Sequence, residues 1–230
     1  MKTFRLSIAL LFSFAVADSQ TQMRLGLAGG MNFSKADQIN FYNSQAHSTT
    51  GFAFGGIVDC PISERVSLLI EPTYTEKGTY AQPQDLQGDI PKLSFDLTYL
   101  EVPVLLKYSM GKELQPYIVF GPSFGVNLSS DAGVQINGPW FGDLEVVANG
   151  GNMVNDVEFS MELGGGLSYE ADDMLRLFIE ARYSHALTNV LRQSGVFVST
   201  GGMTVAAGFP SNAVYRNKGI ILLFGFSIPL

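Results

Sequence analysis

The sequence predicts an all-β fold, an eight-stranded antiparallel up-and-down barrel, and three observations lead to this prediction. Eight segments alternate apolar and polar residues with the period of two that is typical of strands. No segment has the i, i+3, i+4, i+7 spacing of an amphipathic helix. The connections between the segments alternate strictly between long and short. The predicted strands cover 23–33, 51–60, 65–77, 93–110, 113–128, 155–170, 174–187 and 217–229.

The alternation of connection lengths predicts that every tight turn lies at one rim of the barrel and every long loop at the other. The tight turns are 61–64, 111–112 and 171–173, and the long loops are 34–50, 78–92, 129–154 and 188–216. Outer-membrane barrels have this asymmetry, with short periplasmic turns and longer external loops. Segment 140–150 has strand character and is predicted to form a hairpin extension.

Length and composition indicate one folded domain and limit its partners. The chain has 230 residues, of which 46% are hydrophobic and 15% charged, which fits a single β domain. A net charge of −7 without any Lys/Arg cluster argues against nucleic acid as a partner. After the first twenty positions no apolar run is long enough for a helical membrane span.

The first seventeen residues are predicted to be a secretory signal peptide, and 18–230 the barrel domain. Lys2 and Arg5 form a positive start, 6–14 a short apolar stretch, and 15–17 an Ala-Val-Ala cleavage site. The alternative, a membrane-anchoring helix, conflicts with the shortness of this run. Cys60 is the only cysteine, so the chain cannot form an internal disulfide.

The two faces of the predicted strands differ in a way that suits lipid outside and a polar lumen. In the seventh segment Leu175, Leu177 and Ile179 share one face, while Arg176 and Glu180 share the other. An apolar outward face of this kind predicts an integral protein of the outer membrane, in contact with its lipid. Aromatic belts at the two membrane interfaces are predicted from the outward residues Phe33, Tyr74, Tyr108, Tyr169 and Tyr183.

The inward faces carry charges that are expected to form a paired network, because ionised groups cannot stay buried without partners. An eight-stranded barrel leaves an interior that side chains fill, which favours a structural salt-bridge network over a pore. The alternative is a polar path for protons or a small solute. The predicted lumen network consists of Glu71, Glu101, Lys107, Glu162, Arg176, Glu180 and Arg182. Pro103, between Glu101 and Lys107, predicts a bulge or a break in strand pairing, since proline has no N–H to donate.

The last strand resembles the recognition signal of the outer-membrane assembly machinery, with Gly225, Ile228 and Leu230 at the signal positions. Leu230 stands where that signal has a terminal aromatic residue. The assembly machinery is therefore an expected partner.

No constellation in the sequence predicts catalysis, a cofactor or a metal site. The neighbours Ser184 and His185 point to opposite faces of a strand, so they are not expected to form a nucleophile–base pair. Two isolated histidines and one thiol do not form a metal-binding pattern.

Several stretches resemble the PorT-like outer-membrane β-barrel family of Bacteroidetes. They are "LGLAGGMNFS", "LLIEPTYTEKG", "LTYLEVPVLLKY" and "YIVFGPSFGVNL", followed by a Gly-rich apolar final strand. Tyr99–Pro103 and Glu76–Gly78 are the most specific parts of this resemblance. It implies an eight-stranded barrel in a Gram-negative envelope, and its eponymous member is tied to type IX protein secretion.

The resulting expectation is a non-enzymatic outer-membrane barrel with a structural or interaction role, as an accessory of protein secretion. Secretion or envelope proteins are its expected partners. Two alternatives stay open at this point: a narrow channel or small-solute transporter, and a soluble exported ligand-binding barrel.

Overall fold

The computed structural model describes residues 22–36, 44–83, 90–111, 113–138, 142–149, 154–172, 174–192, 196–200, 203–207 and 215–230. The predicted signal peptide, 1–17, lies outside these residues. Every regular element within them is a β-strand. In this described part, no helix is long and apolar enough to cross a membrane.

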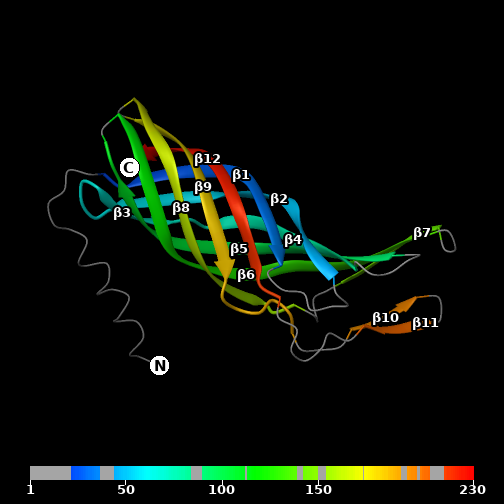
Figure 1. Cartoon of the computed structure of the whole chain (residues 1–230). Helices are drawn as coiled ribbons and strands as arrows, with labels where there is room; N and C mark the ends of the chain where they lie inside the picture. The colour runs from blue at the N-terminus through cyan, green and yellow to red at the C-terminus, as the bar shows by residue number, and fades with distance from the viewer. Residues whose placement is uncertain are drawn as a thin grey trace, which may run out of the picture.

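The strands form a closed antiparallel sheet with eight strand positions around it, since β3 and β4 share one position. This barrel confirms the predicted fold (Figure 1). The sheet closes because β12 pairs with both β1 and β9, and β5 pairs with β6. Its strands, in order around the barrel, are β1 (Arg24–Ala36), β2 (Ser44–Pro61), β3 (Val66–Ile70) together with β4 (Thr73–Pro83), β5 (Ile90–Ser109), β6 (Leu114–Gly138), β8 (Val157–Asp172), β9 (Leu175–Ala186) and β12 (Asn217–Pro229).

The third predicted strand, 65–77, is divided in the structure, so its prediction as one continuous strand was wrong. The division falls at Glu71 and Pro72, because proline has no N–H for the ladder. Neighbouring strands satisfy the gap: Gly56 N donates to the Pro72 carbonyl at 3.0 Å, and Glu71 N to that of Pro103 at 3.1 Å. The register of β5 with β6 does not shift across Pro103, but the ladder on the other side of β5 is interrupted there, between the pairs Ile70–Val104 and Thr73–Glu101, as the prediction of a break in pairing had it.

Much of the predicted loop sequence is strand, which corrects the loop boundaries. β5 has 20 residues and β6 has 25, whereas β9 has 12. The extra length lies at the loop rim, where β7 (Gly142–Asn149) adds to β6 and confirms the predicted hairpin extension. The parts of β2, β4, β5 and β6 beyond the rim, together with β7, are called the external sheet: Ser44–Ser48, Thr79–Pro83, Ile90–Thr98, Ser129–Gly138 and Gly142–Asn149. A separate hairpin consists of β10 (Val196–Thr200) and β11 (Met203–Ala207).

At the opposite rim the connections are tight, as predicted. Gly111, in the turn between β5 and β6, has a φ of 91°, a left-handed conformation that glycine adopts without steric cost. This rim, where β12 also ends, is called the short-turn rim.

The strand register shows how far the strands tilt. A row of paired residues leaves β2 at Thr50 and returns to β2 at Cys60, ten residues further along. The row runs through Phe33, Ile220, Tyr183, Leu163, Phe120, Leu106 and Leu68. For eight strands this stagger corresponds to a tilt of about 40°. A barrel of this size has an interior that side chains can fill.

Candidate functional site

The outward face of the barrel is apolar. Leu163 on β8 is 58% exposed, and Phe224 on β12 is 70% exposed. Other large apolar side chains are exposed on each of β1, β2, β5, β6 and β9: Leu27, Met31, Phe52, Phe54, Leu106, Ile118, Phe120, Leu177 and Ile179. Such a surface would be costly in water and is the surface that a barrel presents to lipid.

The five residues predicted for the aromatic belts all lie on the outward face. Tyr108 and Tyr169 lie near the short-turn rim, next to the turns of β5 and β8. Phe33 and Tyr183 both flank Ile220 in one row near the loop rim. Tyr74 is half-buried and stacks on Phe54, with ring centroids 4.9 Å apart. The register places the two groups roughly 20 Å apart along the barrel axis. Their role as interface belts stays a prediction.

The lumen holds charged side chains in three groups, and the middle one surrounds Arg182. Its guanidinium contacts Glu162 at 3.0 Å, Glu71 at 2.9 Å and, more closely still, Glu180. All four side chains are at least 95% buried. These four residues are called the middle tier. Each of the three guanidinium nitrogens donates to at least one of these carboxylates.

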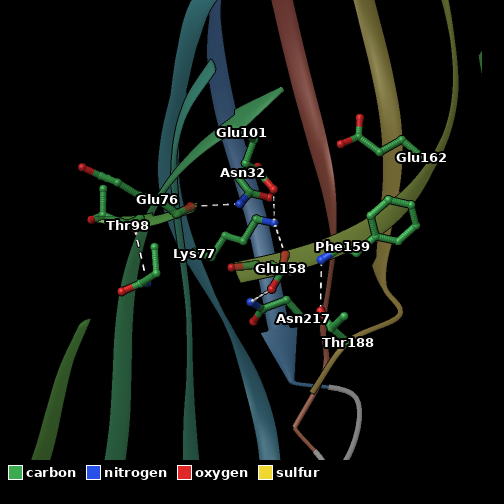
Figure 2. Close-up of polar contacts among 12 residues, drawn as sticks. Asn32, Glu76, Lys77, Thr98, Glu101, Glu158, Phe159, Glu162, Thr188 and Asn217 are labelled. Carbon is green, nitrogen blue, oxygen red and sulfur yellow. Dashed lines mark hydrogen bonds and ion pairs between the residues drawn. The ribbon is translucent and has the colours of Figure 1, made fainter. Parts of the chain in front are cut away.

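Nearer the loop rim, Lys77 on β4 lies between two carboxylates from β5 and β8 (Figure 2). Its Nζ is 2.6 Å from Glu101 Oε1 and 2.6 Å from Glu158 Oε1. Asn217 Nδ2 donates to the second oxygen of Glu158 at 2.6 Å. These four residues are called the loop-side tier. The ammonium also lies 5.2 Å from the centre of the Tyr99 ring, a cation–π contact.

At the short-turn rim, Lys107 and Arg176 face Asp59. Lys107 Nζ is 3.2 Å and Arg176 Nη1 3.8 Å from Asp59 Oδ2. Arg176 Nη2 is 2.5 Å from Glu170 Oε1. These four residues are called the rim tier. Unlike the other tiers it is partly open, since the side chains of Arg176 and Glu170 are 17% and 38% exposed.

An apolar layer separates the rim tier from the middle tier. Leu105 lies between Glu101 and Lys107 on β5, and Phe178 lies between Arg176 and Glu180 on β9. The buried residues of this layer are Ile57, Leu69, Leu105, Tyr117 and Val119, with Ala28 and Phe178 packed against them. The free space that groups of both tiers line here is about 20 Å³, room for about one water molecule.

A second apolar cluster covers the lumen at the loop rim. Phe95 and Leu97 from β5 pack with Val190 and Leu191, which follow β9, and with Tyr215, which precedes β12. Backbone hydrogen bonds fix these connections, from Asn155 N to Val190 O at 2.7 Å and from Val190 N to Tyr215 O at 2.8 Å. Burial of Tyr215 raises the pKa of its phenol well above its ordinary value. Within the part of the chain that the structure describes, the lumen is thus closed at two levels.

The seven residues predicted for a lumen network all point inward, but the structure divides them among three tiers. Glu71, Glu162, Glu180 and Arg182 make up the middle tier. Glu101 belongs to the loop-side tier, and Lys107 and Arg176 to the rim tier.

The prediction missed Lys77, Glu158 and Asp59, which complete the loop-side and rim tiers. The alternation of the strands does place two of them inward. Lys77 is six residues from Glu71, and Glu158 is four residues from Glu162, so each lies on the same face as a residue predicted to point inward. Lys77 was not included in the predicted network because the predicted strand ended at this residue, whereas β4 continues to Pro83.

Of the three residues predicted for the assembly signal, Ile228 and Leu230 face outward and are exposed. Gly225 faces the lumen, where a Cβ would lie 2.5 Å from the Phe178 ring. This close packing against Phe178 explains why a glycine occupies position 225, whether or not the assembly machinery recognises it. Recognition by the assembly machinery stays a prediction.

Ser184 is buried toward the lumen, and its neighbour His185 lies on the other face of β9. Among the described residues, no group of three or more His, Cys, Asp and Glu could hold a metal ion.

A closed antiparallel barrel with an apolar outer surface and a lumen of buried ion pairs is a membrane-spanning β-barrel. The family model described as "Outer membrane protein beta-barrel domain" matches residues 17–192. The chain belongs to this family, and it is an integral protein of the outer membrane.

Solved structures of outer-membrane barrels resemble the chain at low identity. OprG from Pseudomonas aeruginosa is 12% identical with a TM-score of 0.47, and the match covers 91% of this chain and 96% of that one. Neisserial surface protein A is 12% identical with a TM-score of 0.41, covering 93% and 100%. The outer membrane protease OmpT from Escherichia coli is 8% identical with a TM-score of 0.40, covering 94% and 99%. The comparison with curated proteins gave no match.

Proposed function

We propose that this outer-membrane barrel is a non-conducting scaffold that presents the external sheet to protein partners in the envelope. The observation that carries the proposal is the unequal length of the strands. β6 has 25 residues and β9 has 12, lengths of roughly 80 Å and 40 Å at the usual rise per residue. About 9–11 residues suffice to cross a membrane in a tilted strand, so β6 extends far beyond the lipid.

The irregularities of the sheet support a distinct role for this extension. The register shifts between β2 and β4 at Ser48/Ala53 and between β5 and β6 at Thr98/Tyr99. Both positions lie where the external sheet begins, and bulges bend strands at barrel rims. Figure 1 shows β6 and β7 projecting beyond the barrel. β7 is the last strand of this sheet and, among the strands that the structure describes, pairs only with β6, which leaves one backbone edge for another chain.

The closed lumen supports a scaffold rather than a channel. The apolar layer and the ion pairs leave about 20 Å³ between the rim and middle tiers, too little for a hydrated solute. We expect no current above background from the barrel in planar lipid bilayers. A reproducible unitary conductance would favour the channel alternative instead.

As the finer part of the proposal, the partners belong to a protein-secretion machine, and the barrel catalyses no reaction. The resemblance to the PorT-like family supports the secretion role. In a strain that lacks this protein, we expect reduced release of secreted proteins into the medium. Unchanged release would remove the secretion role and leave the scaffold itself in place.

A crosslinking pull-down from intact outer membranes tests the external sheet. In the test variant an Asn-Gly turn replaces residues 133–147, so that Ala132 and Ala148 still pair across it. In the matched control the same turn replaces 197–206 of the β10–β11 hairpin. We expect a specific partner with the full chain and the control, and its loss with the test variant. Equal recovery from all three proteins would contradict the proposal.

A further inference from the structure

The mouth of the lumen at the short-turn rim encloses a cavity of about 350 Å³. Residues from seven strands line it, among them the inward-facing Arg24, Asp59, Lys107 and Arg176. The turn after β2 contributes Glu64 and Arg65. The volume lies in the lower part of the range of small-molecule sites, roughly 300–1,000 Å³. This cavity is called the rim pocket.

Most of the charges in the rim pocket already neutralise one another. Asp59 faces both Lys107 and Arg176, at 3.2 and 3.8 Å. Glu170 is paired with Arg176 at 2.5 Å. Neither carboxylate is therefore left over to neutralise a further cation by direct contact.

Arg24 is the cation that this pairing leaves out. Its half-buried guanidinium donates to Ser227, with 3.4 Å from Nε to Oγ and 3.2 Å from Nη2 to the carbonyl oxygen. No carboxylate of the described residues forms an ion pair with it. Arg176 repels its charge, and Glu170 and Asp59, both already paired with Arg176, attract it. Two guanidinium groups thus border the same cavity.

Arg65 adds a second cation without an ion pair among the described residues. It is exposed in the turn and lines the same cavity as Arg24. Within the described part of the chain, Glu64 is the single acidic lining residue beyond Asp59 and Glu170. Among the residues that the structure describes, four cationic and three acidic side chains line the pocket, an excess of positive charge.

We propose that the rim pocket binds a small anion, a carboxylate- or phosphate-bearing solute, with Arg24 as its principal contact and Arg65 as the second. A guanidinium group offers a planar fork of donors that matches two oxygens of either anion. Partial burial strengthens this contact relative to one in open water. The site lies at the end of the barrel opposite to the external sheet, so it is independent of the proposed scaffold function.

Titration of the refolded barrel in an uncharged maltoside detergent tests the site. Inorganic phosphate is followed by ³¹P line broadening, and citrate by calorimetry and by its competition with phosphate. We expect saturable binding that becomes at least tenfold weaker in Arg24→Gln and about threefold weaker in Arg65→Gln. Arg216→Gln is the matched control, because Arg216 is exposed near the start of β12, at the other rim.

Heat-modifiable migration on gels verifies that each variant is folded. Arg65→Gln keeps the test decisive if Arg24→Gln does not fold, since Arg65 is exposed in a turn. Saturable binding of either anion that depends on these arginines supports the site and shows which oxyanion it prefers. The absence of saturable binding of both anions, or an equal loss in the control, overturns the proposal.

Discussion

Neighbouring residues on β8 lie in opposite environments. Glu162 faces the lumen and is 1% exposed, whereas Leu163 faces outward and is 58% exposed. Glu158 and Ser160 continue the buried polar face, and Phe159 continues the apolar outer face. A soluble barrel has the reverse arrangement, because water favours polar groups outside and apolar groups inside. The opposite burial of neighbouring residues on β8 shows that the medium around the barrel is apolar. A soluble ligand-binding barrel does not fit this arrangement.

The buried polar face is stable only if its charges are paired, and removal of Arg182 is the strongest way to break it. Arg182→Leu leaves three carboxylates of the middle tier without their cation. We expect a loss of about 3–5 kcal/mol in the free energy of unfolding. Urea titration in phospholipid vesicles measures this change. The double variant Arg182→Leu/Glu162→Gln is expected to recover part of the loss, and no recovery would argue against the ion pairs described here.

On the outer face, adding a charge is expected to destabilise the barrel, whereas in the lumen removing a charge does so. Leu163→Arg places a cation near the middle of the lipid, with an expected cost of about 2–4 kcal/mol. Leu163→Ala is the control, because it shortens the side chain without adding charge. The same urea titration compares the two variants. An arginine that costs no more than the alanine would show that this face does not contact lipid.

The two smallest effects are expected at the short-turn rim, where Gly111→Ala changes the backbone of a turn and Arg176→Gln removes a partly exposed charge. For Gly111→Ala we expect a loss of about 1 kcal/mol, since its φ of 91° strains any residue with a Cβ. A Cβ there would also lie 2.6 Å from the Leu114 carbonyl oxygen. Thermal or urea unfolding measures the change, and an unchanged midpoint would contradict the strained turn.

Arg176→Gln is expected to have the smallest effect, below about 1 kcal/mol, because partly exposed ion pairs are screened by water. Both this variant and Arg182→Leu remove an arginine from an ion-pair network, at positions that differ in burial, so the pair sharpens the comparison of rim and middle. Equal losses in urea titrations of the two variants would contradict a closed middle tier beneath an open rim.

The facing of each strand could be predicted from the sequence because a period of two assigns alternate residues to opposite sides. Glu101, Glu162 and Arg182 were placed inward on this basis. Their grouping into tiers could not be predicted, since it depends on the stagger between strands. That stagger brings Lys77 of β4 to Glu158 of β8, 81 residues away.

The length of the external sheet could not be predicted from the alternation of apolar and polar residues either. Segments rich in Gly, Asn and Ser, such as 129–138, have the composition of turns. They form strands because neighbouring strands offer paired backbone groups, as when Asp131 pairs with Asp96 on one side and Asn149 on the other. Tertiary context decides such cases over local propensity.

Lipid contact of the outer face is the central claim, and quenching by spin-labelled lipids tests it most directly. In a Cys60→Ala background, a small fluorophore on Leu163→Cys should be quenched by spin labels attached to the acyl chains. The thiol of Ser160→Cys, on the buried face of the same strand, should resist modification until the barrel is unfolded. An unquenched label at 163, or a freely reactive thiol at 160 in the folded barrel, would contradict the facing on which the account depends.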